Sequence, residues 1–276
     1  MRANKSNTER RNFIAKAMSI GFGFSLGSGL AQSAMAGEKR ALPSLKGRKI
    51  LFTWGGWPGH EPEVFAKYFD EWLKGEGASV QVFNSTEPYA DETLMAGIDL
   101  VIQSITMDEI PDEHAKGLLA AIRENGTGMA GWHGGMCDSF RSNTEYQFMT
   151  GGQFVSHPGG KVDHTVDVTD TDDEITEGLS SFKINSEQYY MHIDPNVKVL
   201  ATTQFNGNIL PWIDGATIPV VWKKMHGKGR VFYSSLGHNL ADITEIPESF
   251  AIVKRGIRWA SASKYEKPER WLNPVY

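Results

Sequence analysis

Three histidines in this chain share a local pattern, because each follows an apolar run and has glycine beside it. The segments are Gly59-His60-Glu61, Gly131-Trp132-His133-Gly134-Gly135 and Gly237-His238. Glycine permits a sharp turn and lets a ligand approach the main chain. Imidazoles gathered in such turns can transfer protons near neutral pH or bind zinc or a similar ion. Taken singly, each is better explained as a loop histidine bonded to a nearby carbonyl, but three together favour a site.

Two further residues have types suited to acid–base chemistry. Glu187 lies in Ser186-Glu187-Gln188-Tyr189-Tyr190, and aromatic neighbours would raise its pKa and suit it to act as an acid or base. A surface turn is the alternative interpretation of that segment. His157 precedes Pro158 and is a candidate for contacting substrate. We expect His164 and His226 to face solvent, and His192 is left undecided.

Nucleophilic catalysis fits this sequence poorly. Cys137 is the single cysteine, which excludes an internal disulfide. The position directly after the apolar run 128–132 holds His133 instead, and Cys137 is expected in the following helix, where a thiol is buried and unreactive. Residues 37–276 contain no Gly-x-Ser-x-Gly motif, so we set aside a serine hydrolase.

Hydrophobic periodicity indicates which elements position these residues. Buried strands are predicted at Lys49–Trp54, Val80–Phe83, Leu100–Ile102 and Gly128–Trp132, and amphipathic helices at Pro62–Lys74 and Asp112–Asn125. This order predicts an α/β fold, a flavodoxin-like, doubly wound and mostly parallel sheet with helices on both faces. Ligands bind such sheets at the carboxyl ends of the strands, which here precede the loops containing His60 and His133.

The second half of the chain is less regular. Further strands are predicted at Lys161–Val168, Val197–Thr203, Pro219–Lys223 and Gly229–Tyr233, a hairpin or loop at Asn206–Gly215, and a closing helix at Glu248–Ala260. There is no internal repeat and no linker rich in Gly, Pro or Ser. Residues 37–276 are therefore predicted to form one domain.

Composition limits the function classes. The 276 residues are 40% hydrophobic and 11% aromatic, which is enough to build a core and excludes a disordered chain. The formal net charge of -5 argues against a partner that is a nucleic acid. No uninterrupted apolar stretch is long enough for a typical transmembrane helix.

The first 36 residues have the features of an export signal. Basic residues, the pair Arg10-Arg11 among them, precede a weakly apolar, glycine-interrupted stretch from Ala17 to Leu30, and Ala34-Met35-Ala36 is a small-x-small cleavage pattern. The paired arginines resemble the twin-arginine signal. We predict a signal peptide over residues 1–36 and a periplasmic protein with no membrane contact after cleavage. An uncleaved anchor is the alternative, which the glycines disfavour.

Longer motifs resemble the ThuA-like (trehalose-utilisation) family over about Lys49 to Ala260. They are Gly131-Trp132-His133-Gly134-Gly135, Gly151-Gly152-Gln153-Phe154-Val155-Ser156-His157-Pro158, and Gly227-Lys228-Gly229-Arg230-Val231-Phe232-Tyr233 followed by Leu236-Gly237-His238. That family is similar in fold to class I glutamine amidotransferases. His133 stands where those enzymes have their cysteine, so the resemblance does not imply glutamine hydrolysis.

The resemblance implies sugar metabolism, often beside oxidoreductases that make 3-keto-glycosides. The family positions carried over to this chain are His60, His133, His157, Glu187 and His238. Ser186 departs from the pattern, since an acidic residue usually precedes that glutamate.

Our hypothesis is an enzyme that acts on a keto-glycoside or keto-disaccharide by elimination, isomerisation or hydrolysis. His133, Glu187 and His238 would carry the acid–base chemistry, and either a neutral histidine or a divalent metal such as zinc, held by His60, His133 and His238, would stabilise the enolate. His157, Trp57, Trp132 and Tyr189 would contact the sugar. The alternative is a non-catalytic carbohydrate-binding or accessory subunit of a sugar oxidoreductase. The sequence does not indicate the oligomeric state.

Overall fold

The structure is a computed structural model that describes residues 41–269. The predicted signal peptide, residues 1–36, lies outside the described residues and stays a prediction.

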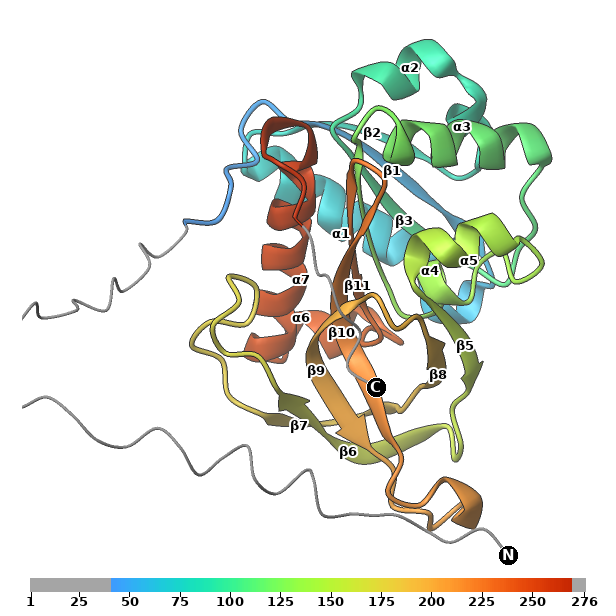
Figure 1. Cartoon of the computed structure of the whole chain (residues 1–276), viewed down its shortest axis with the longest axis vertical. Coiled ribbons are helices and arrows are strands. Elements are labelled where there is room, and N and C mark those ends of the chain that lie inside the picture. Colours follow the sequence, from blue (N-terminus) through green and yellow to red (C-terminus); the bar gives the residue numbers. More distant parts are fainter. Residues whose placement is uncertain (1–40, 270–276) are drawn as a thin grey trace, which may run out of the picture. The chain divides into compact units, whose positions relative to one another are not determined.

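One nine-stranded sheet organises the described chain, in the order β2-β1-β3-β4-β11-β10-β9-β6-β7 (Figure 1). The five strands from β2 to β11 pair in parallel, and every later pairing is antiparallel. The strands of this sheet are β1 Lys49–Gly56, β2 Ser79–Phe83, β3 Leu100–Thr106, β4 Gly128–Trp132, β6 Lys161–Val168, β7 Phe182–Glu187, β9 Lys198–Gln204, β10 Thr217–His226 and β11 Gly229–Ser234. A separate pair, β5 Gly152–Ser156 and β8 Tyr190–Ile193, is antiparallel.

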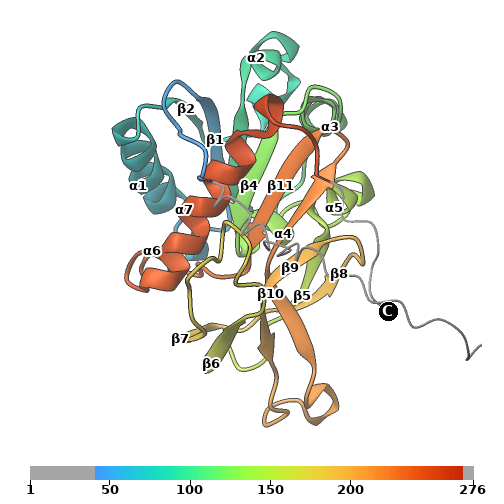
Figure 2. The same ribbon diagram turned by 60° about the vertical axis from the view of Figure 1, so that its left-hand side comes forward.

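Helices cover both faces of the parallel part of the sheet. On one face lie α1 Pro62–Gly75 and α7 Pro247–Ser261, with α6 Leu240–Thr244 beside α7 (Figure 2). The other face carries α2 Glu92–Gly97, α3 Asp112–Arg123, α4 Gly134–Cys137 and α5 Thr144–Thr150. The predicted doubly wound, mostly parallel α/β architecture is therefore confirmed.

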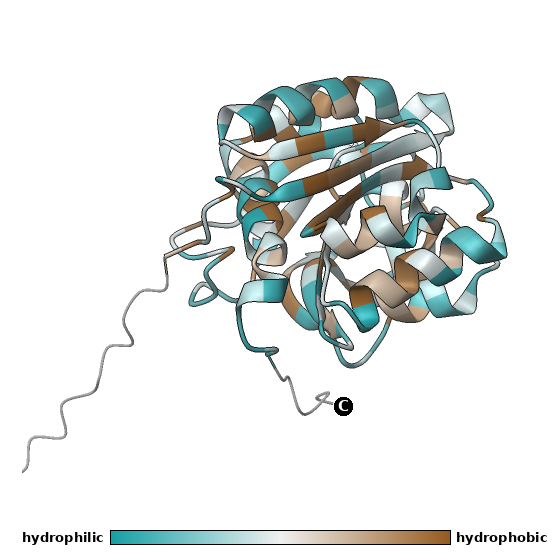
Figure 3. Cartoon of the chain, turned by 90° about the horizontal axis from the view of Figure 1, so that it is seen from above, coloured by the Kyte–Doolittle hydropathy of each residue, from teal (hydrophilic) through white to brown (hydrophobic). Residues whose placement is uncertain are grey.

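Strand alternation divides the buried residues into two cores. On β1, Ile50 and Phe52 face the core beneath α1 and α7, whereas Leu51 faces the core beneath α3. The helices are correspondingly apolar on their inner sides and polar outside (Figure 3). Because both faces of the parallel strands are covered, the strands read as continuous apolar runs, which made them recognisable in the sequence.

The antiparallel strands extend the sheet past the carboxyl ends of β1, β3 and β4. Figures 1 and 2 show β5 to β10 gathered at that end of the molecule. The observed β10 and β9 overlap their predicted ranges, while β5, β7 and β8 were not predicted. β7 ends at Glu187, which is one of the candidate site residues.

Within residues 41–269, helices are all too short or too polar to cross a lipid bilayer.

Candidate metal centre

Three loops at the carboxyl edge of the sheet each contribute one imidazole. His60 ends the short 3-10 helix after β1, His133 directly follows β4, and His238 follows β11. The ring centroids of His60 and His133 are 4.6 Å apart, those of His60 and His238 5.3 Å, and those of His133 and His238 5.6 Å. The predicted convergence of the three histidines is confirmed.

Glu187 joins the three imidazoles from the opposite side. Its Oε2 atom lies 3.0 Å from His133 Nε2, 3.3 Å from His238 Nδ1 and 3.8 Å from His60 Nε2. One atom from each of the four side chains lies within 4.8 Å of the others. The carboxylate is 8% exposed, so the alternative of a surface turn is wrong.

The main chain at His133 makes a sharp turn. His133 has φ 47° and ψ -143°, a conformation that side-chain-bearing residues rarely adopt. Gly134 then passes so close to His60 that an added Cβ would lie 2.6 Å from the His60 Cε1 atom. Glycine at position 134 is therefore required for the two imidazoles to approach each other.

Hydrogen bonds fix the orientation of two of the rings. His133 Nδ1 donates to the carbonyl oxygen of Ser235 at 2.8 Å, and His60 Nδ1 is hydrogen-bonded to Thr106 Oγ1 at 3.0 Å. Each bond leaves the Nε2 atom of that ring turned toward Glu187. Outer contacts of this kind typically orient metal-binding histidines.

Burial and the neighbouring side chains shift the pKa values of His133 and Glu187 in opposite directions. Burial lowers the pKa of His133 to about 4, despite the neighbouring Glu187 carboxylate. Burial alone would raise the pKa of Glu187, but the imidazoles of His133, His238 and His60 outweigh it and hold that pKa well below the usual range. The expectation that aromatic neighbours raise the pKa of Glu187 is therefore wrong, and Glu187 is an anion at neutral pH.

The donor set fits a divalent cation. Since the Ser235 carbonyl can only accept, His133 Nδ1 carries the hydrogen, and a neutral His133 presents a lone pair at Nε2. That lone pair faces a carboxylate oxygen at 3.0 Å, so two acceptors meet. A proton or a cation between them removes this repulsion. Three imidazoles and a carboxylate are ligands that zinc uses.

His157 and Trp57 border this group on more exposed positions. His157 Nε2 lies 3.7 Å from Glu187 Oε1, and its side chain is 41% exposed. Trp57 is 43% exposed, and its ring meets His60 edge to face at 4.7 Å. Both residues therefore lie on the exposed side of this group.

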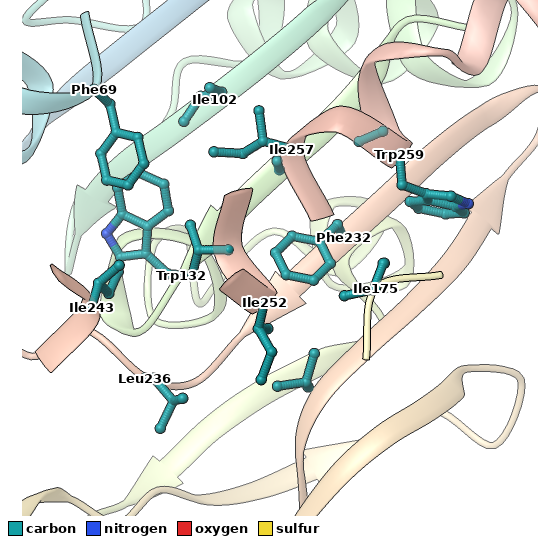
Figure 4. Packing of buried hydrophobic residues seen from close by; sticks show 14 of the residues in the cluster. Phe69, Ile102, Trp132, Ile175, Phe232, Leu236, Ile243, Ile252, Ile257 and Trp259 are labelled. Atoms are coloured by element: carbon teal, nitrogen blue, oxygen red, sulfur yellow. The ribbon is translucent and has the colours of Figure 1, made fainter. Parts of the chain in front are cut away.

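Two residues predicted to contact sugar are buried instead. Trp132 is 1% exposed and packs among Phe65, Phe69 and Ile243, which leaves no ring face for a ligand (Figure 4). Tyr189 is 2% exposed and stacks on His133 with 4.0 Å between ring centroids. Tyr189 therefore supports the His133 ring from behind.

The structure also settles the remaining histidines and the cysteine. His164 and His226 are half-buried, which corrects the expectation that they face solvent, and His192 is exposed. Cys137 lies buried at the end of α4, and burial raises the pKa of its thiol well above the usual range. The prediction that Cys137 lies buried in the helix after His133 is confirmed.

Three supporting residues were missed in the sequence. Thr106 ends β3 at the same sheet edge, so the rule that identified the histidine loops pointed to it as well. Ser186, the residue that departs from the family pattern, donates a hydrogen bond to the Asp242 carboxylate. An acidic side chain therefore lies beside this position in the fold, although it comes from another part of the sequence. Glu61 accepts a hydrogen bond from the Leu240 backbone N–H at 3.1 Å and so connects the His60 loop with α6. Neither of these long-range pairs has a local sequence signal.

Comparisons with known proteins agree with the fold. The family described as "ThuA: Trehalose utilisation" matches residues 49–260. A ThuA-like protein from Bacteroides uniformis is similar in structure, with a TM-score of 0.64, 15% identity, and coverage of 81% of this chain and 94% of that one. For a ThuA-like protein from Parabacteroides merdae the TM-score is 0.62, the identity 18%, and the coverage 80% and 93%. Among curated proteins, none matches this sequence significantly.

Proposed function

Because this chain belongs to the ThuA (trehalose utilisation) family, we propose that it is a metal-assisted enzyme acting on an oxidised carbohydrate, a keto-glycoside or keto-disaccharide. One observation carries the proposal: His60, His133, His238 and Glu187 bring four ligand atoms within 4.8 Å at the carboxyl edge of the sheet. That edge is where α/β sheets bind their ligands. A purely structural role would not explain why three buried polar side chains and one half-buried one meet at this point.

The chemistry follows from the properties of a keto sugar. A carbonyl at C3 acidifies the hydrogen on C2, so a base can remove that proton while the electron pair moves to the carbonyl oxygen. A divalent ion held by the four side chains would supply Lewis-acid stabilisation of the enolate. In an elimination, the C1–O glycosidic bond then breaks, a C1–C2 double bond forms, and the departing oxygen takes a proton.

His157 is the best-placed base in this scheme. It is more exposed than His238, whose side chain is 19% exposed, and its Nε2 atom faces the Glu187 oxygen on the side away from His133. Glu187 thereby lies against His133 through Oε2 and beside His157 through Oε1. We assign proton transfer to His157, and the holding of the metal to His60, His133, Glu187 and His238.

The proposal also covers the cellular location of the protein and the source of its substrate. The twin-arginine-type signal in the sequence supports export to the periplasm of an already folded chain. A metal would then be acquired before export. The keto sugar would be supplied by an oxidoreductase acting on the corresponding glycoside, because the carbonyl must be introduced by an oxidation.

Metal analysis combined with turnover tests the proposal. The wild-type protein should contain about one divalent ion per chain and should consume a 3-keto-disaccharide. His133→Ala should lose both properties while the protein remains folded by circular dichroism. His192→Ala is the matched control, because His192 is an exposed histidine outside the group. Carbohydrate binding that occurs without turnover and is unaffected by chelators would contradict an enzyme and favour an accessory, carbohydrate-binding subunit.

A further inference from the structure

Two cavities border the β6–β7 hairpin, in which β7 ends at Glu187. The larger, of about 510 Å³, is lined by Asp163, Thr165, Lys183 and Asn185 together with their strand neighbours. The smaller, of about 180 Å³, lies between Asp163, Gln188 and the excursion 205–213 of the β9–β10 connection. Asp163 lines both cavities, so they meet at this residue.

The chain connects these cavities directly with the proposed reaction site. Pro158 and Gln188 line the smaller cavity, and they follow His157 and Glu187 in the sequence. In the β6–β7 register, Asp163 pairs with Asn185, and Lys161 pairs with Glu187. Side chains two residues apart on a strand share one face and are about 6.6 Å apart. Asn185 therefore lies on the same strand face as Glu187, at about the spacing of one sugar ring.

The polar groups at the junction suit the recognition of neutral hydroxyls. Asn185 Nδ2 donates to Asp163 Oδ1 at 2.7 Å, and both residues are exposed. A paired carboxylate and amide present two kinds of acceptor and one remaining amide N–H, which can bind two adjacent hydroxyl groups. Lys183, two residues before Asn185, adds a cationic donor at the wall of the larger cavity. Phe205 supplies an apolar surface in the smaller cavity.

We propose that the β6–β7 cavities, centred on Asp163 and Asn185, form a second sugar subsite. This subsite holds an unmodified, hydroxyl-rich ring while the ring linked to it reaches the candidate metal centre. The inference rests on the proposed function and deepens it, because it makes the substrate a disaccharide or longer glycoside. Small keto monosaccharides would lack the contacts to Asp163 and Asn185.

Calorimetric titration of unoxidised sugars into chelator-treated protein isolates the subsite from the chemistry. The probes are glucose and a panel of trehalose, maltose and sucrose. At least one disaccharide should bind about tenfold more tightly than glucose, the gain expected from one or two well-formed hydrogen bonds. Asn185→Leu should remove that preference. The matched control is Gln81→Leu, since Gln81 is an exposed strand amide on β2, at the other end of the sheet order.

Two results would overturn the subsite. The first is that the wild type binds glucose and every disaccharide of the panel with equal affinity. The second is that Asn185→Leu leaves the preference for a disaccharide unchanged. Asn185→Ser, which keeps a polar group, serves as the second variant if Asn185→Leu unfolds. Because these titrations need neither metal nor turnover, a preference that Asn185→Leu abolishes would support the subsite even if keto sugars were not consumed. In that case only the proposed catalysis would fail.

Discussion

At the scale of single residues, we expect the hydrogen bonds that orient the histidine rings to influence how tightly the candidate centre would bind a cation. Thr106→Val keeps the shape of the side chain but removes the hydroxyl bonded to His60 Nδ1. We expect metal affinity to fall about tenfold, at the lower end of what such outer contacts contribute. Competition with a chelator of known affinity measures the change.

Thr127→Val is the control for this substitution. Thr127 is also buried and donates a hydrogen bond, to the Ile98 carbonyl oxygen at 3.1 Å, but it lies outside the histidine group. This variant should lower stability while leaving metal affinity unchanged. If both variants lose affinity equally, the Thr106 hydroxyl has no specific role.

His226 gives a pH dependence that is separate from the histidine group. Burial lowers its pKa to about 4, and Lys224 and Arg123 act in the same direction. Below pH 6.5 the unfolded chain binds a proton at His226 that the folded chain does not, so stability falls as the pH drops from about 6.5 to 4. His226→Gln should lessen that fall. Thermal unfolding from pH 7.5 to 4.5 measures it, and parallel curves for the two proteins would refute the assignment.

Much of the candidate site could be predicted from residue types and their sequence neighbours alone. His60, His133 and His238 were recognisable because each stands beside glycine at the end of an apolar run, and the fold brings these ends to one edge. The roles of Trp132 and Tyr189 were not recognisable. An aromatic beside a site residue points to the opposite side of a strand or turn as readily as into the site, and only the packing decides.

At the scale of elements, Glu61 ties two histidine loops together. It sits between His60 and α1, and its carboxylate accepts the Leu240 N–H at the start of α6, close to His238. Because this bond is exposed, its contribution to stability is small, but it restricts the distance between the two loops. We expect Glu61→Ala to weaken metal binding about threefold with little change in melting temperature.

Glu63→Ala is the matched control, since Glu63 is an exposed acid in the first turn of α1. Chelator competition and thermal unfolding on both variants separate a positioning effect from a general loss of charge. An unchanged affinity in Glu61→Ala would show that the loops hold their positions without this bond.

The elements differ in how well a sequence reveals them. The central strands β1, β3 and β4 are buried on both faces and α1 and α7 have apolar stripes, so periodicity identified them. By contrast, β7 alternates buried and exposed residues over only its first five positions, and β8 is four residues long. Short strands of this kind are defined by their partners, which is why Glu187 was recognised as a candidate without its strand.

At the scale of the whole molecule, we expect metal binding to be coupled to folding. The four ligands come from positions 60, 133, 187 and 238, so folding must complete the sheet before they meet. A cation that binds only the folded chain stabilises it by about 2.7 kcal/mol at a concentration of 100 times the Kd. For a domain of this size, we expect zinc to raise the melting temperature by roughly 5 to 10 °C.

Glu187→Gln distinguishes this coupling from unspecific zinc effects. The substitution keeps the shape but removes the anion that completes the donor set, so the zinc-dependent shift should largely disappear. In chelator-treated protein the same change also removes the contact between the carboxylate and the His133 lone pair, 3.0 Å apart, and should therefore cost little stability. Calorimetric melting of both proteins with zinc and with chelator gives all four values. Equal zinc shifts in wild type and variant would mean that the cation binds elsewhere, and the assignment of these four residues would then be wrong.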